Sequence, residues 1–251
     1  MWISALIGMC TKFTEVTLAV HFRERNRHGD YVGGPMYYIK NGLGKNWRFL
    51  AVLYSAFGVL TVFGTGNATQ VNTITTAIDT ALINFNVISE SSTGRLNLIL
   101  GIVITLLVGM VLLGGIKRIG SVSEKLVPFM ALFYIALALG VVILNIGRVP
   151  AVFHDIVYGA FNPSAVTGGV VGTMIVSMQK GVARGIFSNE AGLGSAPIAA
   201  AAAQTKEPVR QGLVSMTGTF IDTIVICTMT GLSIVLTGAW PVSYTHLRAH
   251  E

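Results

Sequence analysis

Long windows without a single charged side chain recur along this chain, and they restrict its fold more than any other feature. A helix of about 20 apolar residues crosses a bilayer core about 30 Å thick. Four uncharged windows of at least that size cover residues 49–78, 96–116, 126–147 and 156–179. Each is therefore a candidate transmembrane helix.

Two further runs are apolar with few interruptions. Residues 211–240 contain one charged side chain, Asp222, and residues 1–20 contain two, Lys12 and Glu15. Together with the uncharged windows they predict six transmembrane helices. The strands of a membrane barrel would alternate in segments of about ten residues, and these runs are too long and continuous for that. The fold class is therefore an all-α integral membrane protein.

The composition excludes the main soluble alternatives. Charged residues make up 11% of the 251 residues, against roughly 25% in a typical soluble domain, and the mean hydropathy is +0.67. A soluble enzyme or a disordered chain would need far more solvated surface. The two cysteines, Cys10 and Cys227, lie in apolar runs and do not form a disulfide framework or a metal pair.

Basic residues alternate strictly between the loops. Fourteen of the seventeen Lys and Arg lie in loops on one side, two lie on the other, and Arg248 lies in the tail. Cytoplasmic loops of membrane proteins carry the excess of Lys and Arg. We therefore expect a multi-pass protein of the cytoplasmic membrane that enters from outside. The net charge of +6 reflects this orientation and contact with lipid headgroups; without a concentrated basic patch interleaved with aromatic residues, it does not predict a nucleic-acid partner.

Asp222 is the strongest functional candidate, because an ionisable group inside a span is costly and is a candidate site by default. It lies eleven residues after Gln211, near mid-bilayer depth. A carboxylate there needs a cation, a proton or a hydrogen-bonding partner. An ion or proton site and a buried hydrogen bond between helices both satisfy this requirement, and the residues alone leave both readings open.

The second window contains the polar sequence GTGNATQVNT at residues 64–73. Asn67 and Gln70 are three residues apart and share a helix face, and Gly66 allows close approach to the backbone. Substrate contact and small-residue helix packing joined by amide side chains are equally compatible with this pattern. A nucleotide-binding loop is excluded, because the third glycine and the preceding strand are missing.

The fifth window is the least helix-like, because glycines precede and follow its polar residues Thr173 and Ser177. Discontinuous helices of this kind expose backbone groups to substrate and ion in many transporters. Arg184 and Glu190 follow at the cytoplasmic face. They are candidates for a gate ion pair, and an ordinary surface pair is the alternative. No grouping of side chains suited to nucleophilic catalysis is evident, so the chain is not expected to be an enzyme.

Three stretches resemble the sodium/alanine symporter family, also called the alanine or glycine:cation symporters. They are ALIGMCTKFTEVTLAVHFRERN at residues 5–26, GGPMYYI at 33–39 and RGIFSNEAGLGSAP at 184–197. The resemblance implies a leucine-transporter-type fold with two inverted repeats, of which the six helices are core helices two to seven. It also implies sodium-coupled uptake of alanine or glycine by alternating access.

The same resemblance assigns roles to the candidate residues. Thr173 and Asp222 would face a sodium ion, and the substrate would contact Gly66, Asn67, Gln70, Thr173 and Ser177. No cofactor is expected beyond sodium as the coupling ion. Proton coupling and a passive channel are the alternative functions, and the oligomeric state stays open.

The resemblance divides the chain into two parts. Residues 1–241 are expected to form a partial transporter domain, with the first broken core helix and those after the seventh lying outside the sequence. Residues 242–251, VSYTHLRAHE, are polar where another hydrophobic helix is due. We therefore expect an internal fragment with an atypical tail.

Overall fold

The computed structural model describes residues 1–62, 64–89, 92–161 and 172–238, without the side chains at 65, 66, 116, 172–174, 176 and 177. Its regular secondary structure in the described part is helical except for one antiparallel hairpin with two residues in each strand. The elements are α1 (Trp2–His21), β1 (Glu24–Arg25), β2 (Tyr31–Val32), α2 (Pro35–Gly42), η1 (Lys45–Trp47), α3 (Arg48–Val62), α4 (Thr65–Asn84), α5 (Thr93–Leu112), α6 (Gly115–Leu144), η3 (Ile146–Arg148), α7 (Val149–Phe161), α9 (Gly172–Asn189), α10 (Ser195–Ala201), α11 (Pro208–Thr219), η4 (Phe220–Ile226) and α12 (Cys227–Thr237).

Five helical stretches among the described residues are long and apolar enough to cross a membrane. They are Trp2–His21, Lys45–Asn84, Thr93–Leu112, Lys117–Leu144 and Pro208–Thr237. The expected all-α fold is thereby confirmed, and five of the six expected spans coincide with candidate membrane spans. The remaining span, predicted over 156–179, includes residues outside the described ranges and stays a prediction.

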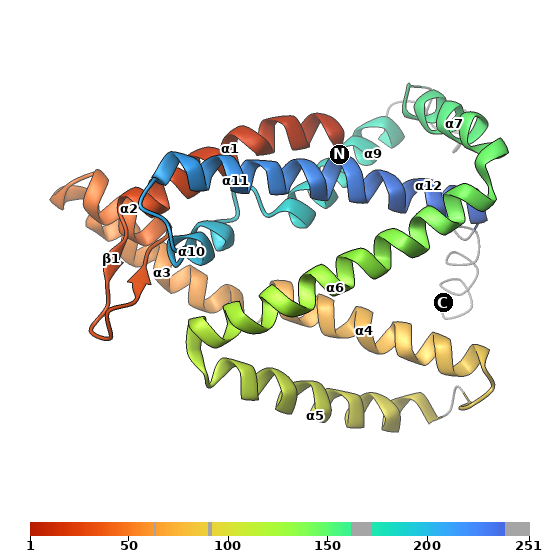
Figure 1. Cartoon of the computed structure of the whole chain (residues 1–251), viewed down its shortest axis with the longest axis horizontal. Coiled ribbons are helices and arrows are strands. Elements are labelled where there is room, and N and C mark those ends of the chain that lie inside the picture. Colours follow the sequence, from red (N-terminus) through yellow and green to blue (C-terminus); the bar gives the residue numbers. More distant parts are fainter. Residues whose placement is uncertain (63, 90–91, 162–171, 239–251) are drawn as a thin grey trace. The chain divides into compact units, whose positions relative to one another are not determined.

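The described chain forms two compact units. Met1–Gly42 and Phe129–Glu251 form the first unit, and Leu43–Pro128 form the second. In the first unit α1 lies alongside α11 and also contacts α10, α9 and η4 (Figure 1). This close packing depends on Gly212 of α11, where an added Cβ would lie 2.2 Å from Thr17 Oγ1 and 3.0 Å from the carbonyl oxygen of Phe13. Every element that holds the site described below contacts α1.

The second unit consists of α3, α4 and α5 with the first part of α6, and α4 packs against both α3 and α5. The single window expected over 49–78 comprises two helices, because α3 ends at Val62 and α4 begins at Thr65. The amide Nδ2 of Asn67 donates to the carbonyl oxygen of Val62 over 3.1 Å and so satisfies one of the terminal carbonyls of α3. The following loop, expected around residues 79–95, is shorter, because α4 continues to Asn84 and α5 begins at Thr93.

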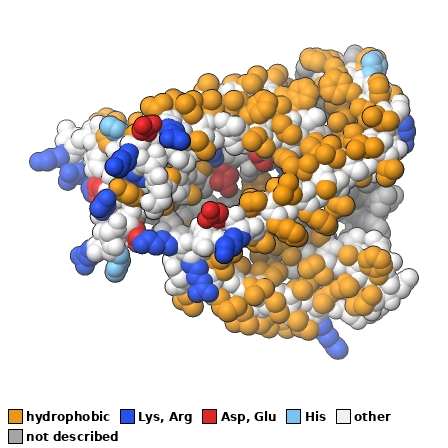
Figure 2. Space-filling view, viewed as in Figure 1, with side chains coloured by type: hydrophobic (Ala, Val, Ile, Leu, Met, Phe, Trp, Pro, Cys, Tyr) orange, Lys and Arg blue, Asp and Glu red, His pale blue; other side chains and the backbone are white. Residues whose placement is uncertain are grey.

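The β1–β2 hairpin of the first unit is tied to α10 by one side chain. The guanidinium of Arg23 donates to the carbonyl oxygens of Ala201 at 3.0 Å, Ala203 at 2.8 Å and Thr205, and it stacks over the ring of Tyr31. A cation at a helix C-terminus also matches the negative end of the helix dipole. Lys and Arg side chains gather over this hairpin and α2, whereas hydrophobic side chains cover α6 (Figure 2).

Candidate functional site

A tight turn after α9 begins the candidate site. The backbone adopts positive φ at Glu190 (56°), Gly192 (84°) and Gly194 (81°), a conformation that is unusual for a non-glycine residue such as Glu190. Within this turn the backbone N–H of Ala191 donates to Asn189 Oδ1 over 3.0 Å. The turn therefore holds the Asn189 side chain, which is 6% exposed, inside the first unit.

Asn189 continues the network into the last described span. Its Nδ2 donates to Thr223 Oγ1 over 3.0 Å, and Thr223 Oγ1 donates to Asp222 Oδ2 over 3.0 Å. Thr223 is fully buried. The amide of Asn189 thus fixes the hydroxyl that binds the carboxylate, although the two residues are 34 positions apart in sequence.

Asp222 receives a second hydroxyl donor from α9. Ser188 Oγ donates to Asp222 Oδ2 over 2.7 Å and lies 3.6 Å from the thiol of Cys227. Asp222 lies in η4, which is a π-helical segment, and such segments are rare and occur frequently at functional sites. The carboxylate and the hydroxyls of Ser188 and Thr223 form a set of hard oxygen atoms of the kind that binds alkali and alkaline-earth cations.

A buried ammonium group completes the network on α1. Lys12 is 9% exposed, and its Nζ donates to the backbone carbonyl oxygen of Asn189 over 2.7 Å. The negative charges of Glu190, Glu15 and Asp222 all act on this ammonium. One positive charge thus lies within electrostatic reach of three carboxylates.

Glu15 lies on the same face of α1 as Lys12, three residues further along the helix. Its carboxyl oxygen Oε2 is buried and has no hydrogen-bond partner in the described part of the chain. The turn is therefore held from α1 by the ammonium of Lys12.

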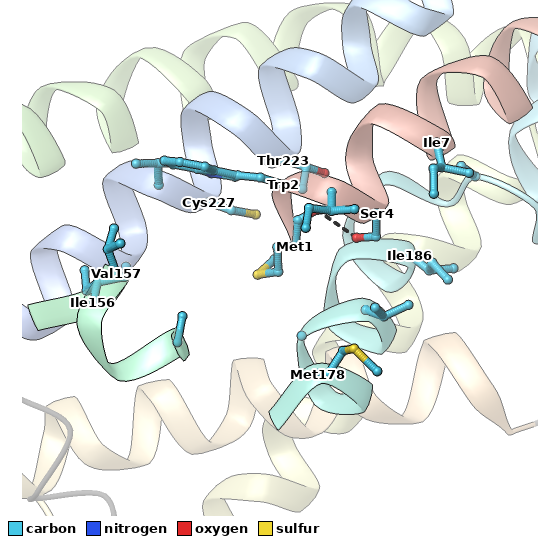
Figure 3. A pocket seen from close by; sticks show the side chains of 18 of the residues that line it. Met1, Trp2, Ser4, Ile7, Ile156, Val157, Met178, Ile186, Thr223 and Cys227 are labelled. Carbon is cyan, nitrogen blue, oxygen red and sulfur yellow. Dashed lines mark hydrogen bonds between the residues drawn. The ribbon is translucent and has the colours of Figure 1, made fainter. Parts of the chain in front are cut away.

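An apolar pocket of about 840 Å³ adjoins this network. Figure 3 shows its wall, to which α1, α7, α9 and the last span all contribute. Thr223 and Cys227 belong both to this wall and to the network, and the indole N–H of Trp2 donates to Thr228 Oγ1 over 2.8 Å at the same wall. The pocket therefore reaches the hydroxyl that binds Asp222.

The predicted site residues fall into separate groups. Asp222 lies in the network, whereas Asn67 and Gln70 lie on exposed faces of α4 in the second unit. Gly66 lies in the first turn of α4, and the side chains of Thr173 and Ser177 lie outside what the structure describes. Their predicted contacts with substrate and sodium stay predictions.

The predicted gate pair is not formed within the described part of the chain. The Glu190 carboxylate accepts a hydrogen bond from Ser195 Oγ over 2.8 Å. The ion pairs between described residues join Lys40 to Glu24 and His154 to Asp155. A gate that joins Arg184 to Glu190 stays a prediction for another state of the protein.

Sequence reasoning did not single out Lys12, Ser188 and Asn189 as site residues. The sequence nevertheless contained two signals. The stretch RGIFSNEAGLGSAP contains Ser188 and Asn189 together with three glycines, and Lys12 interrupts an otherwise apolar run. Ser188 and Asn189 lie between Arg184 and Glu190, which the sequence places at the cytoplasmic face. The turn instead directs them toward Asp222.

Known proteins resemble this chain over nearly its whole length. The chain matches the profile of the sodium:alanine symporter family over residues 1–249. An uncharacterized transporter of Haemophilus influenzae is 54% identical over 242 residues, which are 96% of this chain and 50% of the relative. The sodium/alanine symporter AgcS of Methanococcus maripaludis is 46% identical over 95% of this chain and 50% of its own length. The probable sodium/glutamine symporter GlnT of Bacillus subtilis is 39% identical over 96% of this chain and 47% of its own length.

Proposed function

This chain belongs to the sodium:alanine symporter family, and on that premise we propose that the intact protein couples sodium entry to uptake of a small neutral amino acid, alanine or glycine. Membership confirms that the chain is part of a multi-pass membrane transporter and not of an enzyme. The chain spans about half the length of the relatives it matches. The substrate and the coupling ion therefore belong to the proposal.

The oxygen set around Asp222 carries the proposal. A carboxylate in an apolar span is costly unless a cation or hydrogen-bond donors compensate its charge. Ser188 and Thr223 place two hydroxyl oxygens within 3.0 Å of Asp222 Oδ2. Sodium binds hard oxygen ligands, so this arrangement supports an ion site at Asp222.

Further parts of the proposal follow from the family. They are a leucine-transporter-type inverted-repeat fold, alternating access, substrate contacts from Gly66, Asn67, Gln70, Thr173 and Ser177, a sodium contact from Thr173, and a cytoplasmic gate at Arg184 and Glu190. In such a cycle sodium favours the outward-facing state and shifts the conformational equilibrium by its differential affinity for the two states. Binding of sodium and of the amino acid then reinforce each other.

Uptake by the intact protein in liposomes tests the proposal. Labelled alanine is offered with an inward sodium gradient or with choline in its place, and unlabelled glycine and glutamine serve as competitors. We expect saturable uptake that requires sodium, with glycine competing more strongly than glutamine. The glutamine competitor is included because one relative is named a probable sodium/glutamine symporter.

The Asp222→Asn variant links the coupling to this site, and Asp155→Asn is its control because Asp155 is exposed. Loss of the carboxylate should raise the half-saturating sodium concentration at least about tenfold, which corresponds to about 1.4 kcal/mol of lost binding. Equal uptake with sodium and choline would contradict sodium coupling. Uptake driven by pH alone would favour a proton-coupled transporter, and non-saturating flux would favour a channel.

A further inference from the structure

A second carboxylate lies inside the spans of the other unit and plays no part in the proposed sodium site. Asp79 is on α4 and Asn97 is on α5, and both lie within candidate membrane spans. Asn97 Nδ2 donates to Asp79 Oδ2 over 2.9 Å. At 1.5 Å per residue, both residues lie roughly 6–8 Å inside the ends of their helices.

Two oxygen atoms of this pair lack a hydrogen-bond donor. Asp79 Oδ1 and Asn97 Oδ1 are both buried, and neither has a partner within the described part of the chain. An ionised carboxylate and an amide carbonyl can only accept hydrogen bonds, so the two atoms cannot satisfy each other. An unsatisfied buried acceptor is unfavourable, and such a group in a native structure calls for an explanation, of which a bound ion is one.

Few charged side chains lie on the helices that pack against α4. α4 packs against α3 and α5, whose titratable or charged side chains are Arg48, Tyr54 and Arg95. Arg48 and Arg95 are exposed, and the ion pairs found among the described residues do not include Asp79. A hollow of about 360 Å³ along α5 reaches Asn97, and most of its other lining residues are apolar.

We propose that Asp79 and Asn97 form a second binding site for a small monovalent cation, separate from the network around Asp222. A proton taken up from solvent would convert Asp79 Oδ1 into a hydroxyl, which then donates to an acceptor such as Asn97 Oδ1. A sodium ion would instead be coordinated by the two oxygens, with water completing its shell. Both ions supply the positive charge that the two acceptors lack.

Cation-dependent stability of the purified intact protein tests this site without relying on transport. Asp222→Asn is the parent, so that the site proposed for coupling does not contribute, and Asp79→Asn is added to it. Thermal unfolding is followed while sodium replaces N-methylglucamine at fixed pH, and separately while the pH is lowered at fixed sodium. A ligand that binds the folded state raises the midpoint temperature by mass action.

We expect one of the two ions to raise the midpoint of the parent by at least about 2 °C, and Asp79→Asn to abolish that rise. Loss of the sodium response identifies sodium as the ligand, and loss of the pH response identifies the proton. A parent without either response overturns the proposal, as does a response that Asp79→Asn leaves intact. Asp155→Asn in the same parent is the matched control and should change neither response.

Asn97→Asp provides a second variant should Asp79→Asn fail to fold. It places a second carboxylate beside Asp79, and two carboxylates that share a site bind a proton or cation more strongly. The half-saturating cation concentration should therefore fall by about tenfold or more. An unchanged or weaker response would overturn the site. Neither variant alters the residues around Asp222, so this proposal and the proposed sodium coupling can fail independently.

Discussion

Asp222 and Asp79 are both carboxylates within candidate membrane spans, yet the structure treats them in opposite ways. Asp222 accepts hydrogen bonds from two hydroxyls, and one of these is itself held by Asn189. Asp79 has one amide donor, and two oxygens of its pair have none. An acidic residue in an apolar run therefore identifies a candidate site, but the hydrogen-bond donors around the carboxylate differ greatly from one such site to another.

The difference in donors follows from the number of elements around each carboxylate. The Asp222 network draws side chains from α1, α9 and η4 together with the turn after α9, whereas the Asp79 pair joins α4 to α5 alone. More elements provide more donors within reach. If this contrast affects stability and sodium binding, substitutions at the two carboxylates should have different effects on both.

The largest effect is expected when the ammonium of the Asp222 network is removed. Lys12→Met leaves the Asn189 carbonyl without its charged donor and three carboxylates without their common cation, and it should lower the free energy of unfolding by about 3 kcal/mol. The same change should tighten sodium binding at Asp222, because the local charge becomes more negative. Thermal unfolding and the sodium dependence of uptake measure the two effects.

Lys40→Met is the control for this variant. Lys40 and Glu24 form an exposed ion pair at 2.8 Å, and exposed pairs contribute about 0–1 kcal/mol. Equal destabilisation by Lys12→Met and Lys40→Met would show that the buried ammonium has no special role.

The next effect concerns the amide that connects the turn to the span. Asn189→Ala removes the donor to Thr223 and the acceptor for Ala191, and it should lower the free energy of unfolding by about 2 kcal/mol. Because Thr223 then loses its fixed orientation, the half-saturating sodium concentration should rise while the KM for alanine at saturating sodium changes little. Asn46→Ala, at an exposed position of η1, is the control. Parallel changes in both kinetic constants would assign Asn189 a structural role only.

A third prediction compares the two carboxylates by whether replacing each with asparagine stabilises or destabilises the protein. In buffer without sodium at pH 8, Asp79→Asn should stabilise the protein by about 1 kcal/mol, because two amides can each donate to the other. Asp222→Asn should destabilise it by a similar amount, since the neutral amide oxygen accepts the two hydroxyl donors less strongly than a carboxylate oxygen does. Thermal unfolding of both variants under one condition gives the comparison. A change in stability in the same direction for both variants would contradict the contrast between the two carboxylates.

The smallest effect is expected at Ser188, an exposed hydroxyl that gives Asp222 one of its two donors. Ser188→Ala should cost about 0.5 kcal/mol of stability and raise the half-saturating sodium concentration about twofold. Sodium titration of uptake is the more sensitive measurement here. Ser195→Ala is a matched control, since its hydroxyl binds Glu190 and not Asp222; an equal sodium shift in both variants would make Ser188 a non-specific contact.

Features that depend on composition and local pattern could be predicted from the sequence. The membrane class and most spans follow from uncharged windows, and α10 follows from Ser195 at its start and Pro197 in its first turn. Asp222 was identifiable because one charge interrupts a long apolar run. These signals need no knowledge of distant contacts.

The partners of Asp222 and Asp79 depend on contacts that no local pattern encodes. Lys12 and Asn189 are 177 residues apart, and Asn97 and Asp79 are 18 residues apart on different helices. Asp79 was interpreted as the beginning of a loop, because the uncharged window ends there, whereas the helix continues to Asn84. A charge that is partnered across helices ends an apolar window without ending the helix.

Arg23 has a mechanical consequence for any transport cycle. One planar guanidinium bridges the hairpin and the chain after α10 through three carbonyl oxygens and a ring contact. A movement that separates the two segments must break all of these bonds together, since a rigid group cannot release them one at a time without leaving its remaining donors misaligned. We therefore expect the hairpin and the end of α10 to move together, with any hinge outside them.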